Sequence, residues 1–392
     1  MRILSFGHIP SWAGGRQESG LANVIYQLAK YMSQCDNTVV TLAATDVFVS
    51  SIMHDKLHVV GWNKGSLIAF ALKHLLLSIR WMIQVIYYKI KFGSVVSVLG
   101  FFFKGLHLYK SIRLCNPEVV HLHGPNACIY DKIIPKNINV VVTMHGLIGL
   151  DKTIKNQSIL YRMEKDICKS KRYSMIGFIA EKLIADFTEL YGTINSPTKV
   201  LLNAYDAKSF YYIEPKQHNG LILATIASLS ENKGQERVVE AISRSGIDCK
   251  YICVGGDSAN YEKKIKDIAL SLNVHWEYQG KKSPSEIREI FSKVDYMILP
   301  SSTEGFGLVY LEAIACGVPV ILPKHLPIVN EKGIIQMGIN SLLLNDSSVD
   351  SIADLLPNLC NYQFNRKMIA DSIVSYSWTN IAKEYVECFK KL

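Results

Sequence analysis

Two glutamates eight positions apart stand on either side of a glycine turn that links an expected strand to an expected helix. The turn reads Thr303-Glu304-Gly305-Phe306-Gly307-Leu308, and the following helix contains Glu312. Gly305 and Gly307 allow backbone conformations that other residues resist, so N–H groups at the helix start can face an anion such as a diphosphate. Glu304 in the loop and Glu312 about two turns into the helix can each accept hydrogen bonds from sugar hydroxyls. Glycine turns before helices are common, so a purely structural pair stays open at this point.

Four further residues lie at positions where a side chain could contact a ligand. Lys233 lies in the turn Asn232-Lys233-Gly234, although an isolated lysine in a turn is usually a solvated surface charge. His145 follows an expected strand, at the edge where open α/β sheets bind ligands, and a neutral imidazole there can orient a sugar hydroxyl. His121 and His123 are expected on opposite faces of their strand, with His121 structural and His123 unassigned.

Two series of strand-then-helix units carry these residues, which is the pattern of parallel sheets covered by helices on both faces. The first series has expected strands over Arg2–Phe6, Thr38–Ala43, Val119–Leu122, Val140–Met144 and Ser174–Ile179. The second has expected strands over Leu221–Ile226, Tyr251–Val254, Tyr296–Leu299 and Val318–Leu322, and helices over Glu236–Ser243, Asn260–Leu272, Pro284–Phe291 and Leu308–Ala315. A stretch without periodicity, Ala204 to Gly220, separates the two series. The fold class is therefore α/β, with the two domains that 392 residues also favour.

Composition limits the class of protein and its compartment. Apolar residues make up 49% of the chain and charged residues 20%, which argues against long disordered segments. Nine scattered cysteines indicate reduced thiols, and the first residues lack a secretory signal pattern, so a cytoplasmic protein is expected. Asp-x-Asp is absent and the Cys and His spacing matches no zinc site. Neither a metal nor a cofactor is expected.

The segment 56–117 contains no acidic residue, while nine lysines and arginines interrupt its apolar runs. The basic residues recur too often for a transmembrane helix of about 20 apolar residues. Two alternatives stay open: helices packed internally with basic residues at the surface, or helices lying on an anionic membrane surface. The basic residues lie within apolar runs rather than on a polar face, so nucleic-acid binding is not expected.

The motifs around the two glutamates resemble, in order, those of the retaining glycosyltransferases of family 4, also called glycosyltransferase group 1. Glu304 to Pro319 resembles the family's E-x7-E signature and its E-A-x-A-x-G-x-P-V segment, and Asn232-Lys233-Gly234 resembles its phosphate-binding K-G. In the first half, Pro10 to Gly15 is similar to the N-terminal glycine loop, and Thr143-Met144-His145 to the T-x-H motif. The likeness runs nearly end to end and is thin from about Met53 to Arg113.

The resemblance implies the GT-B fold, with two Rossmann-like domains facing each other across a donor-binding cleft. Residues 1–204 would form the acceptor-side domain, and residues 205–374 would bind the nucleotide sugar. Residues 375–392 would form a C-terminal helix that packs back on the first domain. The implied enzyme is a metal-independent hexosyltransferase that uses a UDP- or GDP-linked sugar.

The resemblance also implies roles for individual residues. Glu312 would accept hydrogen bonds from the nucleotide ribose, Glu304 would contact the transferred sugar, and Lys233 would stabilise charge on the leaving diphosphate. His145 would be a sugar contact rather than a nucleophile. The expected catalytic residues are Glu304, His145 and Lys233, and the expected donor-binding residues are Gly15, Ser228, Lys233, Glu304, Gly305, Phe306, Gly307, Leu308 and Glu312.

One departure from the family pattern concerns the grip on the diphosphate. Five residues before Lys233 the family usually has arginine, where this chain has Ser228, which brings no charge; Arg16 is an alternative cation.

The expected acceptor is a lipid-linked saccharide, an intermediate in the synthesis of a surface polysaccharide such as lipopolysaccharide or capsule. The protein is expected to be cytoplasmic and peripheral on the inner face of the membrane. Two other functions stay open: a GT-B-like sugar-nucleotide epimerase, and a catalytically degenerate glycosyltransferase that serves as a partner protein.

Overall fold

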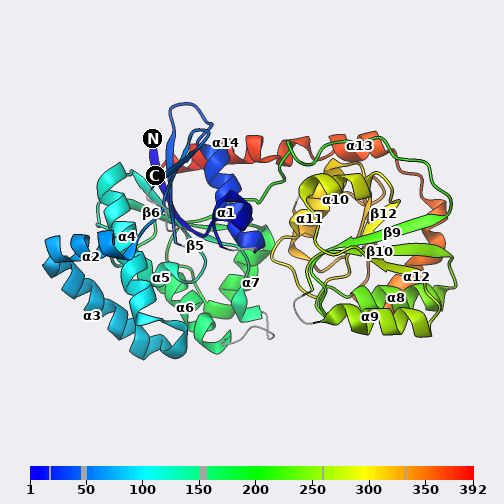
Figure 1. The fold of residues 1–392 in the computed structure, drawn as a ribbon, viewed down its shortest axis with the longest axis horizontal. Coiled ribbons are helices and arrows are strands. Elements are labelled where there is room, and N and C mark those ends of the chain that lie inside the picture. Colours follow the sequence, from blue (N-terminus) through cyan, green and yellow to red (C-terminus); the bar gives the residue numbers. More distant parts are fainter. Residues whose placement is uncertain (17–18, 46–50, 151–156, 258–259, 332) are drawn as a thin grey trace. The chain divides into compact units, whose positions relative to one another are not determined.

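The computed structural model describes residues 1–16, 19–45, 51–150, 157–257, 260–331 and 333–392 (Figure 1). The chain divides into two compact units: an N-terminal unit of Met1–Leu202 with Trp378–Leu392, and a C-terminal unit of Asn203–Ser377. The boundaries expected from sequence, after residues 204 and 374, lie within a few residues of these divisions.

The described part of the N-terminal unit contains an eight-stranded sheet in the order β3-β4-β2-β1-β5-β6-β7-β8. All of its paired neighbours are parallel except β3 and β4. The strands are β1 (Arg2–Gly7), β2 (Val39–Ala44), β3 (Ile52–His54), β4 (Leu57–Val60), β5 (Val119–His123), β6 (Asn139–Met144), β7 (Met175–Phe178) and β8 (Thr198–Val200). The central strands are buried along nearly their whole length, as the continuous apolar runs of a parallel sheet require.

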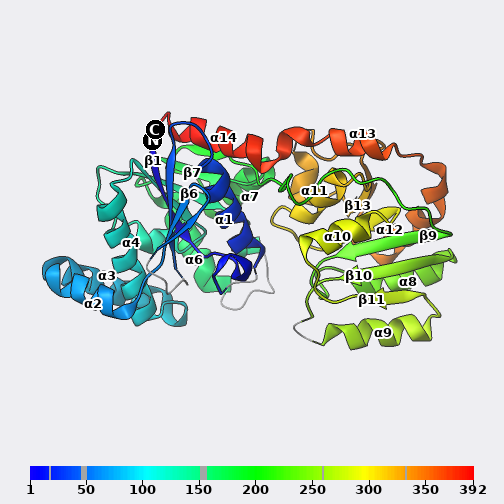
Figure 2. The ribbon, with the colours of Figure 1, turned by 45° about the horizontal axis from the view of Figure 1, so that its top comes forward.

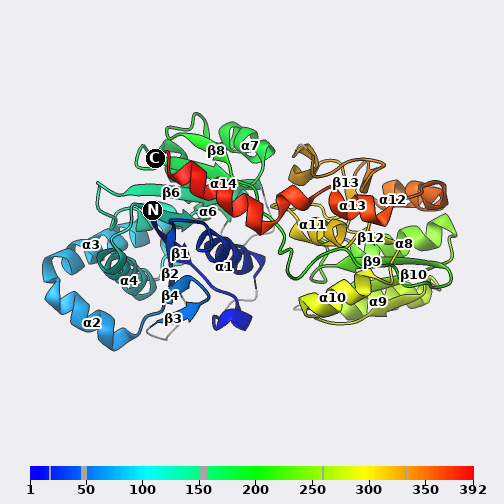
Figure 3. The ribbon, with the colours of Figure 1, turned by 90° about the horizontal axis from the view of Figure 1, so that it is seen from above.

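Helices cover this sheet on both faces (Figures 1 and 3). They are α1 (Gly20–Met32), α2 (Lys64–Lys73), α3 (Leu75–Phe92), α4 (Val98–Cys115), α5 (Ala127–Tyr130), α6 (Gln157–Lys169), α7 (Glu181–Tyr191) and α14 (Trp378–Phe389). The last of these, α14, returns from the end of the chain and packs beside α1. Its Tyr385 hydroxyl donates to the Leu201 carbonyl at 2.8 Å, and its Phe389 ring contacts His121.

The C-terminal unit has a six-stranded parallel sheet, among its described residues, in the order β11-β10-β9-β12-β13-β14. Figure 2 shows β9, β10 and β11 side by side. The strands are β9 (Leu221–Ile226), β10 (Cys249–Val254), β11 (Trp276–Tyr278), β12 (Tyr296–Ile298), β13 (Val320–Pro323) and β14 (Ser341–Leu344), and the helices are α8 (Gln235–Ser245), α9 (Tyr261–Ser271), α10 (Pro284–Phe291), α11 (Leu308–Ala315), α12 (Val349–Leu355) and α13 (Arg366–Asp371).

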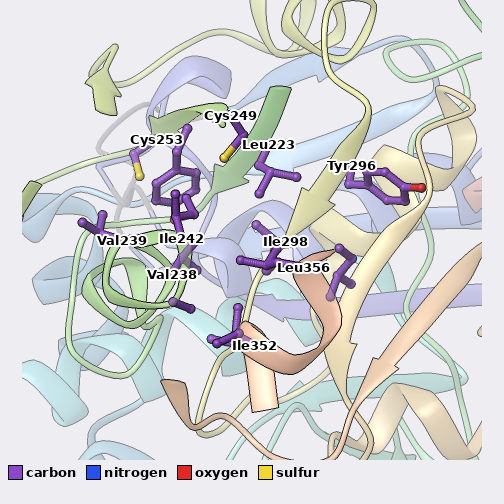
Figure 4. Packing of buried hydrophobic residues seen from close by; sticks show 14 of the residues in the cluster. Leu223, Val238, Val239, Ile242, Cys249, Cys253, Tyr296, Ile298, Ile352 and Leu356 are labelled. Atoms are coloured by element: carbon purple, nitrogen blue, oxygen red, sulfur yellow. The ribbon is translucent and has the colours of Figure 1, made fainter. Parts of the chain in front are cut away.

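One hydrophobic cluster holds a face of the C-terminal sheet to its helices (Figure 4). Leu223 and Ile298 from neighbouring strands pack against Val238 and Ile242 of α8 and Ile352 of α12, all at most 3% exposed. Burying side chains of this size stabilises the fold by about 1.5–3 kcal/mol each. The core therefore fixes β9, β12 and α8, the elements from which the loops of the candidate site extend.

The segment 56–117 forms β4 and the three helices α2, α3 and α4. Helix α4 packs on α2, α3 and the sheet strands β1 and β2, while α2 and α3 lie at the periphery of the N-terminal unit (Figures 1 and 3). Within the residues that the structure describes, no single helix has the length and hydropathy to cross a membrane. Helices α2 and α3 would meet that test only as a pair, and they are bent by 112° at their junction.

Candidate active site

Two loops meet at the carboxyl edge of the C-terminal sheet. One follows β9 and leads into α8, and the other follows β12 and leads into α11. From β9 the chain builds β10 and β11 on one side and then adds β12 on the other. Loops diverge at such a topological switch point, and open α/β sheets bind ligands there. This topology brings together residues that lie 71 positions apart in the sequence.

The first pair brought together is Lys233 and Glu304. The Lys233 ammonium donates to Glu304 Oε1 at 2.5 Å, and the Ser301 hydroxyl donates to the same oxygen at 2.8 Å. Their side chains are 20% and 12% exposed, so the pair is largely withdrawn from solvent yet still reachable by a ligand. A fixed carboxylate beside an accessible ammonium can hold a hydroxyl and a phosphate oxygen at neighbouring positions.

The loop that carries Glu304 is fixed through four consecutive backbone carbonyls, each of which accepts a hydrogen bond from a different side chain. Their donors lie far apart in the sequence: Arg237 on Pro300, Ser347 on Ser301, His325 on Ser302 and Asn232 on Thr303. Asn232 Oδ1 also accepts from the Thr303 N–H at 3.1 Å, so the turn before Lys233 and the turn before Glu304 are tied together. Sequence reasoning missed this clamp, because no local pattern marks these four donors.

Helix α11 begins directly after the glycine turn. Gly307 occupies its N-cap position with a left-handed φ of +85°, and no side chain caps the first turn. Of the two glycines in the turn, Gly307 has the left-handed conformation that glycine favours, while Gly305 does not have a positive φ. Phe306 is 3% exposed and anchors the turn in the core. The helix therefore directs uncapped N–H groups and the positive end of its dipole outward, which favours an anion.

Glu312 is the fifth residue of α11, so it lies little more than one turn into the helix rather than two. Burial and the negative charge of Asp206 raise the pKa of this carboxyl to about 7. Its side chain therefore changes charge near neutral pH, and hydrogen bonds from ligand hydroxyls would favour the charged form.

We expect this titration to appear in nucleotide-sugar affinity. A ribose that donates to the Glu312 carboxylate binds the charged form, so affinity should be full above pH 7 and weaken by up to about tenfold per pH unit below it. Calorimetric titration of the wild type from pH 5.5 to 8.5 measures the slope. The Glu312→Gln variant should bind weakly with a flat profile; an unchanged slope in that variant would mean that another group titrates.

Ser228 lies in the loop after β9, at the position where the family that this chain resembles usually has arginine. The residue is exposed, and its carbonyl accepts from the side-chain amide of buried Gln235 at 3.0 Å. The loop is thus held by its backbone, and Ser228 leaves Lys233 as the basic member of the expected donor set in this unit.

Two expected site residues, Gly15 and His145, belong to the N-terminal unit. Gly15 donates its N–H to the Pro10 carbonyl at 3.0 Å, and a Cβ at this position would lie 2.0 Å from the Ile9 carbonyl oxygen. Only glycine fits that close approach. The glycine therefore has a structural reason in this chain, in addition to the predicted contact with a donor.

His145 follows β6 directly and contacts His123, whose Nδ1 lies 3.0 Å from His145 Nε2. His123 in turn lies 3.2 Å from the Ser5 hydroxyl. His121 and His123 have ring centroids only 4.2 Å apart, so the expectation that they occupy opposite strand faces is wrong, because residues two apart in a strand share a face. His121 contacts the Thr143 hydroxyl at 2.7 Å and is fully buried.

Burial keeps these imidazoles neutral. It lowers the pKa of His145 to about 3 and that of His121 to about 3, with the neighbouring histidine adding to the shift in the second case. A neutral His145 can donate from one ring nitrogen and accept at the other, which suits orientation of a hydroxyl. Its Nδ1 is buried without a partner.

The loop after His145 is held by a buried carboxylate that sequence reasoning missed. Glu164 of α6 accepts from the backbone N–H groups of Ile148 and Gly149, at 3.0 and 3.1 Å, and from the Tyr191 hydroxyl. Since buried charges need such donors, Glu164 fixes this loop rather than serving as an acid. Its only sequence signal is an acidic residue within an otherwise apolar helix face.

The sequence comparisons agree with the motifs at the switch point. Residues 212–372 match the family model described as glycosyl transferases group 1. Residues 212–372 form a group 1 glycosyltransferase domain, and the chain is a glycosyltransferase. A similar protein is an uncharacterized glycosyltransferase of Methanocaldococcus jannaschii, 26% identical over 298 residues that cover 73% of this chain and 77% of that one.

Solved structures give the fold of this glycosyltransferase. The apo form of the lipopolysaccharide outer core galactosyltransferase WaaB matches with a TM-score of 0.69 at 15% identity, covering all of both chains. The Anabaena protein HepE in complex with UDP matches with a TM-score of 0.69 at 16% identity, again covering both chains fully. These likenesses confirm the predicted GT-B fold.

Proposed function

We propose that this glycosyltransferase transfers a hexose from a UDP- or GDP-linked donor to a saccharide acceptor with retention of the anomeric configuration. The observation that carries the proposal is the Lys233–Glu304 ion pair beside the uncapped N-terminus of α11. A nucleotide diphosphate needs a cation and N–H donors, and a transferred sugar needs a hydroxyl acceptor. All of these groups stand on two neighbouring loops. The UDP found in the HepE complex supports the donor class.

In the proposed reaction, the bond from the anomeric carbon to the diphosphate breaks as the sugar gains oxocarbenium character. Lys233 and the α11 N–H groups stabilise the charge that develops on the leaving diphosphate. The acceptor hydroxyl attacks from the face that the diphosphate leaves, and a leaving phosphate oxygen takes its proton. Glu304 binds the sugar and balances its charge without forming a covalent bond. We propose no metal or cofactor in these steps.

The test begins with a thermal-shift panel of UDP- and GDP-linked sugars to identify the donor. Transfer to saccharide acceptors then follows by mass spectrometry, and NMR coupling constants give the anomeric configuration of the product. The proposal expects the donor's configuration in the product. A product of opposite configuration would overturn the mechanism, and free isomerised donor without transfer would indicate an epimerase.

We further propose that the acceptor is lipid-linked, an intermediate of a surface polysaccharide such as lipopolysaccharide or capsule, and that the enzyme meets it at the inner face of the membrane. Support comes from the outward face of α2 and α3. Large apolar side chains recur there every three or four residues and are 46–81% exposed: Ile68, Leu72, Leu75, Leu76, Ile79, Ile83, Ile86, Tyr87 and Ile90. We call this set the α2–α3 apolar face.

The opposite side of α3 is buried, so the apolar residues are divided between two faces. Trp81, Val85 and Phe92 are at most 2% exposed and pack inward. Exposed Lys64, Lys73 and Arg80 lie on the same two helices, with no acidic residue in the whole segment. Exposed apolar patches of this size mark interaction sites, and flanking basic residues suit anionic lipid.

Membrane binding should depend on the α2–α3 apolar face. We expect the double variant Leu76→Ser, Ile83→Ser to bind phosphatidylcholine vesicles containing phosphatidylglycerol at least about tenfold more weakly than wild type. Co-sedimentation at low and high salt measures this, since salt screens the basic contribution. Leu270→Ser, on the 70% exposed position of α9, is the matched control and should bind like wild type. Equal binding of all three proteins would refute membrane contact through this face.

A further inference from the structure

A small polar pocket lies in the N-terminal unit at the carboxyl end of β4, outside the candidate active site. It is lined by the segment from Val60 to Asn63, by Ser66 and Leu67 of α2, and by one face of α4 that comprises His107, Lys110, Ser111 and Leu114. Its volume of about 90 Å³ leaves room for a few waters or one compact group.

Two buried side chains line the pocket with unpartnered polar atoms. His107 and Ser111 are each 1% exposed, and neither His107 Nε2 nor the Ser111 hydroxyl has a hydrogen-bond partner. Leaving such groups unsatisfied is costly, about 1–3 kcal/mol each. Groups of this kind are normally completed by water or by a ligand.

The pocket also holds a cation without a carboxylate partner. The Lys110 ammonium donates to the Ser66 hydroxyl, and within the described residues it forms no ion pair. The segment 56–117 has no acidic residue that could supply one. A lysine held by a hydroxyl at the mouth of a pocket leaves its charge for a ligand.

The remaining wall is the start of α2. Asn63 caps this ten-residue helix by accepting from the Ser66 N–H at 2.7 Å, and the Leu67 N–H donates to the Asn63 carbonyl. The two α2 residues that line the pocket therefore offer it side chains rather than free N–H groups. Burial lowers the pKa of His107 to about 4, partly opposed by hydrogen bonds to the backbone of Val60 and Ala44. The neutral imidazole can either donate or accept at its unpartnered Nε2.

We infer that this pocket binds a phosphate group, with Lys110, Ser66 and Ser111 as donors and His107 Nε2 as a further polar contact to a phosphate oxygen or to an adjacent hydroxyl. A tetrahedral anion matches this set, because it needs several donors around one compact charge. A simple packing void is lined by apolar side chains, whereas this cavity is lined by a cation and two unpartnered polar atoms.

The phosphate can come from a lipid or from a soluble ligand. Helix α2 begins at the pocket and continues into the α2–α3 apolar face, which places a lipid phosphate within reach of acyl chains lying on that face. This assignment of source rests on the proposed function; phosphate binding itself does not.

The experiment titrates full-length protein with inorganic phosphate and with glycerol 3-phosphate, by calorimetry. A Lys233→Met background removes the cation of the candidate active site and so weakens phosphate binding there, and every pocket variant is compared within this background. We expect Lys110→Met to weaken phosphate binding about 10-fold to 100-fold and Ser111→Ala by about 2-fold to 10-fold. Lys73→Met, an exposed lysine of α2 outside the pocket, is the control and should change nothing.

Vesicles decide the source. If the phosphate belongs to a lipid, Lys110→Met should lose more affinity than Lys73→Met for phosphatidylcholine vesicles that contain phosphatidic acid. Equal losses in the two variants, together with tight binding of soluble phosphate, indicate a soluble ligand.

The phosphate site is overturned if wild type does not bind phosphate, or if neither Lys110→Met nor Ser111→Ala changes that binding. Thermal melting checks each variant, and Ser111→Ala carries the test if Lys110→Met unfolds. Donor hydrolysis, measured in the same pocket variants with Lys233 intact, should stay at the wild-type level, and its absence from wild type would count against the proposed function alone.

Discussion

Replacement of Lys233 by methionine should lower the rate of sugar transfer by about 10²- to 10³-fold, while the protein stays folded and loses about 1–3 kcal/mol of its free energy of unfolding. Methionine keeps most of the side-chain length and removes the charge. That charge matters most when the bond to the diphosphate breaks, so kcat should fall more than donor affinity. The side chain is 20% exposed, and its carboxylate partner keeps the Ser301 hydroxyl as a donor.

The matched control for this variant is Lys263→Met, an exposed lysine on α9 of the same unit. Steady-state kinetics with a fixed acceptor and thermal unfolding of both variants give the comparison. Loss of affinity with unchanged kcat would mean that Lys233 only holds the ground-state donor. If Lys233→Met is so unstable that unfolding accounts for the lost activity, Lys233 is a structural residue.

Local sequence signals predicted several elements to the residue. Helix α10 occupies the expected Pro284–Phe291, because Ser283 and Glu286 form a capping box and Pro284 fits the first turn. Strand β9 occupies the expected Leu221–Ile226. The short strands β8 and β14 were not predicted, since three or four residues carry too little periodicity and owe their pairing to the neighbouring strand.

The candidate site was predictable in its motif residues and not in its supports. Lys233 and Glu304 could be named from sequence, and the strand order explains why they meet. The carbonyl clamp could not be found, because Ser347 and His325 reach the loop from 46 and 23 residues away. Its donors are common polar residues without a local pattern. Tertiary structure alone assigns them.

His121 and His123 of β5 are the opposite case, because their arrangement could have been predicted from the sequence. Residues 121 and 123 are two apart in a strand, so their shared face follows from strand geometry alone. For the segment 56–117, by contrast, sequence left internal packing and an exposed interface open, and only the fold shows which apolar residues α4 leaves uncovered.

Glu304→Ala should lower transfer and donor hydrolysis by about 10²-fold or more, while the affinity for the nucleotide diphosphate without sugar should stay the same or rise. The carboxylate is assigned to the sugar, so its loss affects complexes that contain sugar. Its removal also frees Lys233 from the ion pair and makes the ammonium available to a phosphate. The comparison requires that the wild type slowly hydrolyses the donor in the absence of acceptor. A wild type that binds nucleotide but shows no hydrolysis favours a degenerate partner protein.

A double variant separates one joint role from two independent ones. If Lys233 and Glu304 act as a unit around the breaking bond, the double variant Lys233→Met, Glu304→Ala should lose little more rate than the worse single variant. If Glu304 serves only to position Lys233, then Glu304→Gln, which keeps a hydrogen-bond acceptor and loses the charge, should recover most of the rate. If Glu304 balances charge on the sugar, glutamine should be as poor as alanine. The rates of these four variants, measured at saturating donor, therefore distinguish positioning from electrostatic stabilisation by Glu304, whose Oε1 accepts from the lysine in the wild type.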